Sequence, residues 1–452
     1  MGRTLLVSLL LLSVLPARAQ LADLRPEGRV ELYSATRAGG DADYLALRSR
    51  ARVGLTASYD GGELYVESEW TYDVLTDAVR VDLRRAYLDV FFDAVDLRLG
   101  RQELIWGQAD GAFVTDVLMP LDLSEFLAQD IEDVRLGVVA ARATAYVGDA
   151  TLDAVWIPRT PASVLPAPAS PWYPLPESVL GIPVVIGEAD RPAPTLSNSE
   201  VAARLTWQGL PRTDVALIGL YAANRLPTFR KQLTFDLARL FGSTPSDLAF
   251  TATPVYERRT LAGLTFETTL ADPVVLRGEV AFEFGALVDE ALPADSAALV
   301  QGLQDGTLQA SIEQGFLTER SGMQAALVAE RAFGSQTVRL QSLVRHVFDH
   351  DDRLAVEAWE GAATAIWVGR FRRDLLTLRL FATVETTGSY WLNPQLDYAL
   401  RDALTLRLGG QVFGGPQPDD ATALAGLRSA QRLSFATYDA NDLVFIQAIY
   451  GF

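Results

Sequence analysis

The 452-residue sequence contains no cysteine, so it has no disulfide framework and no thiolate chemistry. Beyond the first twenty residues it also lacks any run of the roughly 20 apolar residues that a membrane helix needs. The best candidate, 179–186, is short and contains Pro183. If the mature chain lies in a membrane, it must do so as a closed β-barrel, because only helices and closed barrels satisfy every backbone polar group in lipid.

Basic charge is scarce as well. The chain has 39 Lys and Arg against 57 Asp and Glu, a net charge of −18, and Lys231 is its one lysine. Nucleic acid requires a basic face, so we predict no nucleic-acid partner. Two histidines, His346 and His350, are the only candidates for the base of a Ser–His hydrolase, and their surroundings are unspecific. We therefore predict no enzyme activity, no catalytic residue, no metal and no cofactor.

Residues 1–19 have the parts of a secretory signal. Arg3 supplies the positive start, residues 5–15 are almost wholly apolar, and Ala17-Arg18-Ala19 is an A-x-A cleavage site. We expect export, with residues 20–452 forming a single domain.

The last thirteen residues, 440–452, read as a strand that ends on an aromatic residue. Counting back by twos gives Phe452, Tyr450, Ala448, Ile446 and Val444, all apolar, while the other phase is mixed. An ordinary strand of a soluble sheet would also fit this segment. The segment resembles the closing strand of a bacterial outer-membrane barrel, and this resemblance implies the barrel-assembly machinery as a partner.

Hairpins recur from about residue 29 onward. Residues 47–59 alternate between apolar and charged, Asp60-Gly61 suits a two-residue turn, and residues 62–72 alternate again. This turn sets Arg52 opposite Glu69 on the charged face and Leu55 opposite Val66 on the apolar face. Repetition of the pattern predicts an all-β fold, a transmembrane antiparallel β-barrel of about 18 strands, with 16 as the alternative.

The connections segregate by length. Short ones, such as those at 93–94, 148–149, 209–214, 271–273 and 334–335, fall at every second position, and long ones near 107–132, 158–197, 225–252, 288–317 and 414–438 fall between them. Membrane barrels have short periplasmic turns and long extracellular loops. Aromatic residues lie at the strand ends, including Trp70, Trp106, Trp156, Tyr221 and Trp391 at the outer ends, and they predict two aromatic girdles.

Charged side chains recur on the phase that would face the lumen, where rings of charge can select solutes. The predicted pore-lining residues are Arg48, Arg50, Arg52, Glu67, Glu69, Arg85, Asp89, Arg98, Arg142, Arg204, Arg277, Glu279, Arg339, Arg345, Arg379 and Arg407. For most of them, pairing across strands that merely hydrates the wall is the favoured interpretation. Arg48, Arg50 and Arg52 are the exception, because three arginines on one strand face can exceed the nearby acids and attract anions.

Residues 99–135 are too long for a hairpin and too rich in specific polar residues for a plain loop. We expect 107–132 to fold inward and narrow the lumen. The candidate residues are Arg101, Trp106, Asp110, Asp122, Asp130, Glu132, Asp133 and Arg135. The acids among them are candidates for a divalent cation, but the spacing matches no calcium loop, and solvation or pairing with Arg135 is favoured.

The succession G-R-Q, W-G, P-L-D and D-I-E-D-x-R across Leu99 to Arg135 resembles an uncharacterised family of porin-like outer-membrane proteins, loosely similar to alginate-export barrels. The resemblance implies a barrel in the bacterial outer membrane, in contact with its lipid, that passes a small solute. It implies no particular solute, and the oligomeric state stays open. Two alternatives remain: a surface binding or assembly barrel with a plugged lumen, and a membrane-barrel hydrolase.

Overall fold

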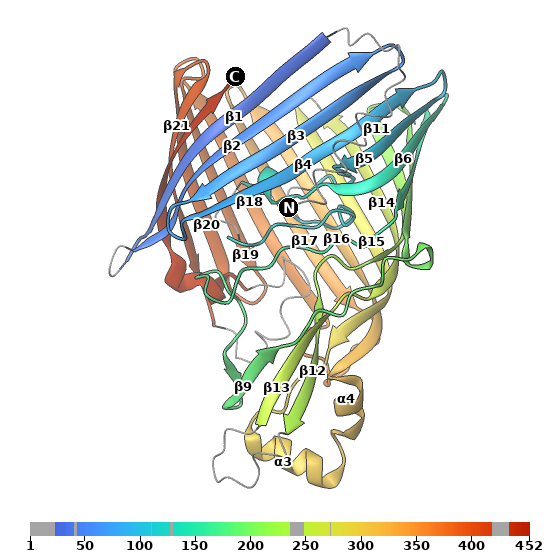
Figure 1. The fold of residues 1–452 in the computed structure, drawn as a ribbon, viewed down its shortest axis with the longest axis vertical. Helices are drawn as coiled ribbons and strands as arrows, with labels where there is room; N and C mark the ends of the chain where they lie inside the picture. Colours follow the sequence, from blue (N-terminus) through green and yellow to red (C-terminus); the bar gives the residue numbers. More distant parts are fainter. Residues whose placement is uncertain are drawn as a thin grey trace.

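The chain forms one closed antiparallel barrel of eighteen strands, with a smaller folded region at one end (Figure 1). The computed structural model describes residues 23–39, 43–109, 111–126, 130–235, 248–271, 273–417 and 434–452. The signal-peptide prediction for 1–19 lies outside these residues. Within them, the all-β barrel and the count of eighteen are confirmed, and the alternative of sixteen is wrong.

The first half of the barrel is built from nine strands. In chain order they are β1 (Asp23–Arg37), β2 (Tyr44–Tyr59), β3 (Gly62–Asp73), β4 (Ala78–Phe91), β5 (Val95–Gln102), β6 (Val138–Val147), β7 (Ala150–Ile157), β10 (Glu200–Leu210) and β11 (Thr213–Ala223). The second half is built from β14 (Arg258–Ala271), β15 (Val274–Asp289), β16 (Leu317–Phe333), β17 (Gln336–Val347), β18 (Trp359–Phe371), β19 (Leu376–Glu385), β20 (Tyr390–Arg401), β21 (Leu404–Gly414) and β22 (Leu443–Gly451).

The first and last strands close the barrel. β1 pairs with β22 from Arg29 opposite Gly451 to Arg37 opposite Leu443. The end of the chain is tied in by the Gly28 N–H, which donates to the Phe452 carbonyl at 2.9 Å. A Cβ at Gly28 would lie 2.5 Å from the Phe452 ring, so glycine lets the terminal aromatic pack onto the wall. The interpretation as a closing strand is confirmed, and the soluble-sheet alternative is wrong.

The predicted register of the first hairpin is confirmed. Arg52 lies opposite Glu69, and Leu55 lies opposite Val66, as the two-residue turn at Asp60-Gly61 requires. One boundary prediction is wrong: residues 209–214 do not form a loop. β10 runs to Leu210 and β11 starts at Thr213, because an irregularity between Trp207 and Leu210 absorbs the extra residues and leaves a two-residue turn.

The outer face of the barrel carries the apolar phase. Large apolar side chains such as Leu205, Leu327, Leu340 and Ile446 are exposed there, while the neighbouring positions point inward. Since apolar side chains face outward along closed strands, the wall is suited to lipid. No helix in the described part of the chain is long and apolar enough to cross a membrane.

The aromatic girdle prediction holds for Trp70, Trp156 and Tyr221, which are exposed. It is wrong for two residues. β5 ends at Gln102, so Trp106 has already left the wall and is only 2% exposed. Trp391 points inward, where its ring stacks on Phe435.

The described parts of the long connections after β7 gather at one end and form a folded cap. Residues 158–199 contribute β8 (Ser178–Val179) and β9 (Ile182–Ile186), which join β12 (Thr228–Phe235) and β13 (Leu248–Val255) in a four-stranded sheet. α3 (Ser296–Asp305) and α4 (Gln309–Gln314) lie beside this sheet (Figure 1). The residues of this sheet fall largely in segments predicted to be long loops, and the parallel pairing of β9 with β13 joins segments more than sixty residues apart, which no local pattern indicates.

The cap has an aromatic core that reaches the barrel rim. Trp172 from 158–199 and Phe126 from 103–137 pack with Phe413 of β21 and with Tyr438, whose ring stacks on Phe126 at 4.3 Å between centroids. Tyr438 belongs to the short helix η4 (Phe435–Asn441). Each long connection buries apolar side chains against another, which holds the cap in one arrangement.

The single lysine joins the cap to the barrel. Lys231 of β12 is fully buried and forms an ion pair with Asp289 at the end of β15. We predict that Lys231→Met destabilises the cap by about 3–5 kcal/mol, because the Asp289 carboxylate is left buried without its counter-charge. Limited proteolysis of the cap should accelerate, while the heat-resistant gel mobility of the barrel is retained. The double variant Lys231→Met/Asp289→Leu should recover much of the protease resistance, and equal sensitivity of both variants would contradict this account.

Candidate functional site: a folded segment inside the barrel

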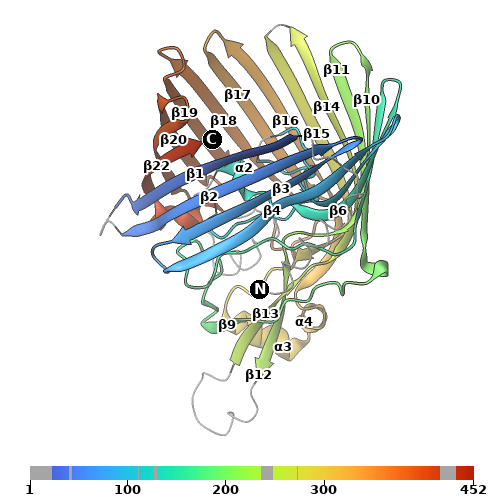
Figure 2. The same cartoon turned by 45° about the horizontal axis from the view of Figure 1, so that its top comes forward.

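Residues 103–137 leave the wall after β5 and return to it at β6, crossing the inside of the barrel. The short helix α2 (Ile131–Val134) lies within the ring of strands in Figure 2. Leu104, Trp106, Val114, Leu118 and Met119 form one buried cluster with side chains of the inner wall. The wall residues of that cluster include Val138, Val155, Ile218, Leu220, Leu261 and Val328. The inner wall is therefore partly apolar, and it holds the segment by burial of apolar surface.

Glu279 of β15 fixes the first half of the segment. Its carboxylate accepts the backbone N–H groups of Gln108 (2.6 Å), Ala109 and Thr115 (3.1 Å), and also the Thr115 hydroxyl (2.6 Å). Backbone groups that turn away from a sheet need partners when buried. Glu279, predicted as a pore-lining residue, is instead a structural acceptor for the folded segment.

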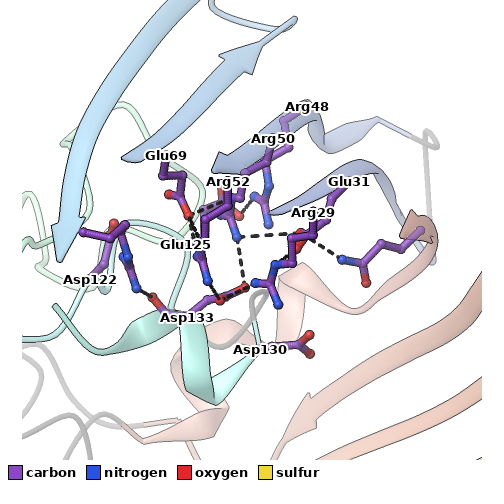
Figure 3. Close-up of polar contacts among 12 residues, drawn as sticks. Arg29, Glu31, Arg48, Arg50, Arg52, Glu69, Asp122, Glu125, Asp130 and Asp133 are labelled. Carbon is purple, nitrogen blue, oxygen red and sulfur yellow. Dashed lines mark hydrogen bonds and ion pairs between the residues drawn. The ribbon is translucent and has the colours of Figure 1, made fainter. Parts of the chain in front are cut away.

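Asp133 fixes the second half (Figure 3). Its Oδ1 lies 2.6 Å from Arg29 Nη2 and 2.9 Å from Arg52 Nη1, and its Oδ2 lies 3.1 Å from Arg50 Nη1. Arg52 also donates to Glu69 at 3.1 Å from Nε. Two of the three arginines predicted to attract anions, Arg50 and Arg52, thus contact a carboxylate of the chain itself. The expected pairing of Asp133 with Arg135 is wrong, because Arg135 pairs with Asp116 at 2.8 Å.

Arg84 completes this cluster and is not in the predicted set. Its Nη2 donates to the Asp133 carbonyl (3.0 Å) and to the Arg135 carbonyl (2.7 Å). An irregularity between Glu67 and Ser68 in the β3–β4 pairing places both Arg84 and Arg85 on the inner side. Because strict alternation assigns neighbouring residues to opposite faces, the sequence pattern could not reveal Arg84.

Four more ion pairs or hydrogen bonds tie the segment to the wall. Arg48 of β2 pairs with Glu125, Arg80 of β4 with Asp122 (3.3 Å), and Arg407 of β21 with Asp130 (2.9 Å). Arg225, at the outer end of β11, donates to the Leu118 carbonyl at 2.8 Å. The predicted residues Asp122, Asp130, Asp133 and Arg135 are therefore brought together with arginines of distant strands.

Arg101 lies elsewhere: it pairs in register with the outward-facing Val139 and donates from Nε to the Arg84 carbonyl at 3.2 Å. Asp110 lies outside the described residues, as does the side chain of Glu132. Among the described residues no group of three or more carboxylates or histidines is arranged to hold a metal ion.

The two histidines are held by backbone groups near the outer rim. His346 Nδ1 lies 2.8 Å from the Ala358 carbonyl, and its ring stacks on Trp359. His350 Nε2 lies 2.7 Å from the Val356 carbonyl.

The electrostatics of Asp133 are dominated by its partners. Burial by itself raises the pKa of the Asp133 carboxyl, but Arg52, Arg29 and Arg50 outweigh burial and hold the pKa below its ordinary value of 3.8. The carboxylate is therefore charged throughout the physiological range, and it balances a wall rich in guanidinium groups.

Most of the other predicted lumen charges pair along the wall. Arg85 lies 2.7 Å from Glu67, Arg98 lies 2.7 Å from Asp89, and Arg142 lies 2.7 Å from Asp153. The remaining pairs are Arg277 with Glu267 (2.8 Å), Arg339 with Glu330, Arg379 with Asp397, and Arg345 with Glu360 (4.0 Å). Arg204 lies opposite Asp153 in the register of β10 and β7. These contacts agree with the interpretation that opposite charges pair and hydrate the wall.

A cavity of about 960 Å³ remains between the segment and the opposite wall. One side is charged and carries Arg29, Arg50 and Arg52 from β1 and β2. The other side is mixed: β18 to β20 contribute Ile366, Val368, Phe381 and Trp391, and between them polar side chains such as Asn393 and Gln395. Nine arginines and six carboxylates line the cavity, but Asp397 and Glu330, just behind it, pair with three of those arginines. The lining is therefore amphipathic and close to charge balance.

This architecture is shared with outer-membrane porins of known structure. The chain belongs to the family of proteins of unknown function DUF1302, whose model matches residues 42–411. The resemblance to an uncharacterised porin-like family is thereby confirmed. No curated protein sequence matches the chain.

Solved structures with the same fold include proteins of Acinetobacter baumannii and Pseudomonas aeruginosa. OccAB1 of Acinetobacter baumannii has a TM-score of 0.52 at 11% sequence identity, covering 96% of this chain and 98% of that one. OccK1 (OpdK) of Pseudomonas aeruginosa has a TM-score of 0.51 at 11% identity, with 96% and 99% covered. A further structure of OpdK contains vanillate, with a TM-score of 0.51 at 10% identity and 96% and 99% covered. At identities this low, the structural likeness shows a shared fold alone.

We predict that Asp133→Asn releases the segment, because Arg29, Arg50 and Arg52 lose their shared counter-charge. The expected cost of about 3 kcal/mol corresponds to a more than hundredfold rise in the open population. A single reporter cysteine at the buried position Leu123 measures it, since the chain has no other cysteine to react. Maleimide labelling of Leu123→Cys should accelerate in Asp133→Asn. It should stay slow in the matched control Asp153→Asn, which removes a wall carboxylate that does not touch the segment.

The same reporter tests the pH dependence. The folded pKa of Asp133 is lower than its unfolded value, so its stabilisation is present above about 3.8 and is lost as the pH falls through the folded pKa. The labelling rate of Leu123→Cys is divided at each pH by that of the exposed reporter Leu196→Cys, with 2,2′-dithiodipyridine as the reagent because maleimide needs the thiolate. This ratio should stay low and flat from pH 8 to pH 5 and should rise only in strong acid. A rise already near pH 6 would show that a different group holds the segment.

Proposed function

We propose that the protein is an outer-membrane channel that passes a small solute through the space between residues 103–137 and the strands opposite. The cavity of about 960 Å³ carries this proposal, because its walls combine strand side chains with side chains of the folded segment. A passage of that kind selects by shape and by lining chemistry. The likeness in fold to the Occ structures is in line with this role.

The lining favours a solute with both a polar and an apolar part. Arginines of β1 and β2 face it from one side, and β18 to β20 add aliphatic and aromatic side chains among polar ones from the other. Because the charges are paired, an isolated ion of either sign gains little from this wall. OpdK, whose fold is shared, has been solved with vanillate, a molecule with a ring and a carboxylate. We infer an amphipathic solute of comparable size.

The segment is the constriction in this proposal. Its anchors come from at least five strands, including Glu279 of β15, Arg407 of β21 and the arginines of β1, β2 and β4. A loop fixed at that many points keeps a defined cross-section, which a size-selective passage requires.

A surface binding role is the second candidate, favoured by one observation. The cap exposes apolar side chains far from the lumen, among them Leu196 in 158–199 and Val300 and Leu303 on α3. Deleting the part of 158–199 that forms β8 and β9 separates the roles: lost partner binding with unchanged conductance would favour this candidate. The hydrolase hypothesis has no observation in its favour beyond the histidines.

We predict stepwise conductance in planar bilayers with a reversal potential near zero in a KCl gradient, because the lining charges are balanced. Asp397→Asn should shift the reversal potential toward that of chloride, since Arg379 and Arg407 both lose a partner. The exposed variant Asp305→Asn on α3 should leave it unchanged. A barrel that inserts and never conducts would overturn the channel.

A further inference from the structure

The wall of the barrel is incomplete beside β4. β4 pairs with β3 over its whole length, from Gly62 opposite Val90 to Asp73 opposite Ala78. On its other side it pairs with β5 only from Ala86 to Phe91. Within the described residues, the outer half of β4, 78–85, therefore has no neighbouring strand on that side (Figure 1). At about 3.3 Å per residue this is roughly 25 Å of strand edge.

The neighbouring strands are too short to fill this place. β5 and β7 have eight residues each, fewer than the roughly 9–11 that a tilted membrane strand needs. Their chain continues instead into 103–137, inside the barrel, and into 158–199, in the cap. Open strand edges are not tolerated in lipid unless they are covered by protein or border a water-filled space.

Residues outside any named strand cover the free edge of β4, where a neighbouring strand would otherwise pair. Residues 120–123 pair in short stretches with 134–136 and with 163–165, through bridges from Leu121 to Arg135 and from Asp122 to Val164. In the described part of the chain, this patch meets the edge through side chains: Arg80 reaches Asp122 at 3.3 Å, and Arg84 reaches two carbonyls of the segment. We call this contact, between 78–85 and 103–137, the β4 seam.

The seam is weakly closed compared with the rest of the wall. A paired stretch of the same length is held by a ladder of backbone hydrogen bonds, which must break together. At the seam, the Arg80–Asp122 pair is half exposed on the arginine side, and such pairs contribute little stability. Arg101 supplies one further bond, to the Arg84 carbonyl.

The central cavity reaches this seam, where its lining is charged on the inside and aliphatic side chains lie beside it on the outer face. Arg85, at the inner end of the free edge, and Glu103 and Ile105, directly after β5, all line the cavity. Ile105 is 50% exposed, and Val79 and Val81 on β4 are 69% and 52% exposed. A molecule leaving the cavity here meets aliphatic side chains at the level of the lipid-facing wall.

We propose that the β4 seam is a lateral portal through which an apolar or amphipathic small molecule passes between the lumen and the outer leaflet. The proposal rests on the proposed channel and adds a second exit to it. Such a molecule gains free energy in lipid in proportion to its apolar surface, so a sideways exit delivers it without passage through water. The amphipathic lining of the cavity suits the same class of molecule.

A covalent bridge across the seam tests the portal. The chain has no cysteine, so Arg80→Cys/Asp122→Cys can be joined selectively by a short bis-maleimide, and the joined and unjoined states of one variant are compared. In a Gram-negative host, entry of the uncharged probe N-phenyl-1-naphthylamine into the outer membrane is followed by its fluorescence. The same protein is measured for ion conductance in planar bilayers.

We expect joining to lower probe entry to the rate of cells without the barrel, while conductance is retained. The control is Leu327→Cys/Ser342→Cys, opposite residues of β16 and β17 on the outward face of the barrel, where the wall is already closed. Joining there should change neither readout. Unchanged probe entry in the joined seam variant, or loss of conductance together with entry, would overturn the portal. Absence of conductance in the unjoined protein would instead overturn the channel itself.

Discussion

Charge balance around Asp133 is the constraint on which the interior depends. Arg29, Arg50 and Arg52 project into one small volume, and three guanidinium groups that close together, two of them largely buried, would be strongly unfavourable without an anion. Glu31 and Glu69 supply part of the counter-charge, and Asp133 supplies the rest from a residue eighty positions further along the chain. The Asp133 carboxylate therefore holds the segment against the arginines of β1 and β2. The position of the segment in turn sets the shape of the lumen.

Apolar contacts and ion pairs hold different halves of the segment. Its first half is buried by apolar contacts with the wall of β6 to β17, where Glu279 accepts three backbone N–H groups. Its second half is held by ion pairs with β1, β2, β4 and β21. The inner wall of the barrel therefore has an apolar side that carries the segment and an amphipathic side that stays open.

The period of the sequence was sufficient to predict the barrel, because side chains on a strand must alternate and a two-residue turn leaves only one register. Arg52 opposite Glu69 follows from Asp60-Gly61 alone. The partners of the lumen arginines could not be predicted in this way. Asp133 and Asp130 belong to the folded segment and not to a neighbouring strand, so no strand register places them beside Arg50 or Arg407. Arg84 was hidden by an irregularity that breaks alternation, and Trp106 was assigned to the girdle because nothing local marks Gln102 as the end of β5.

The early end of β5 has consequences in two places at once. Residues that would have lengthened β5 and β6 are the same residues that fill the lumen, so the constriction is formed from chain taken out of the wall. The outer half of β4 is left without a strand neighbour as a direct result. A barrel that completed β5 would have a continuous wall and a wider lumen, whereas this chain has a narrowed lumen and a seam. The constriction and the seam are therefore one structural feature, and a change that moves the segment must alter both.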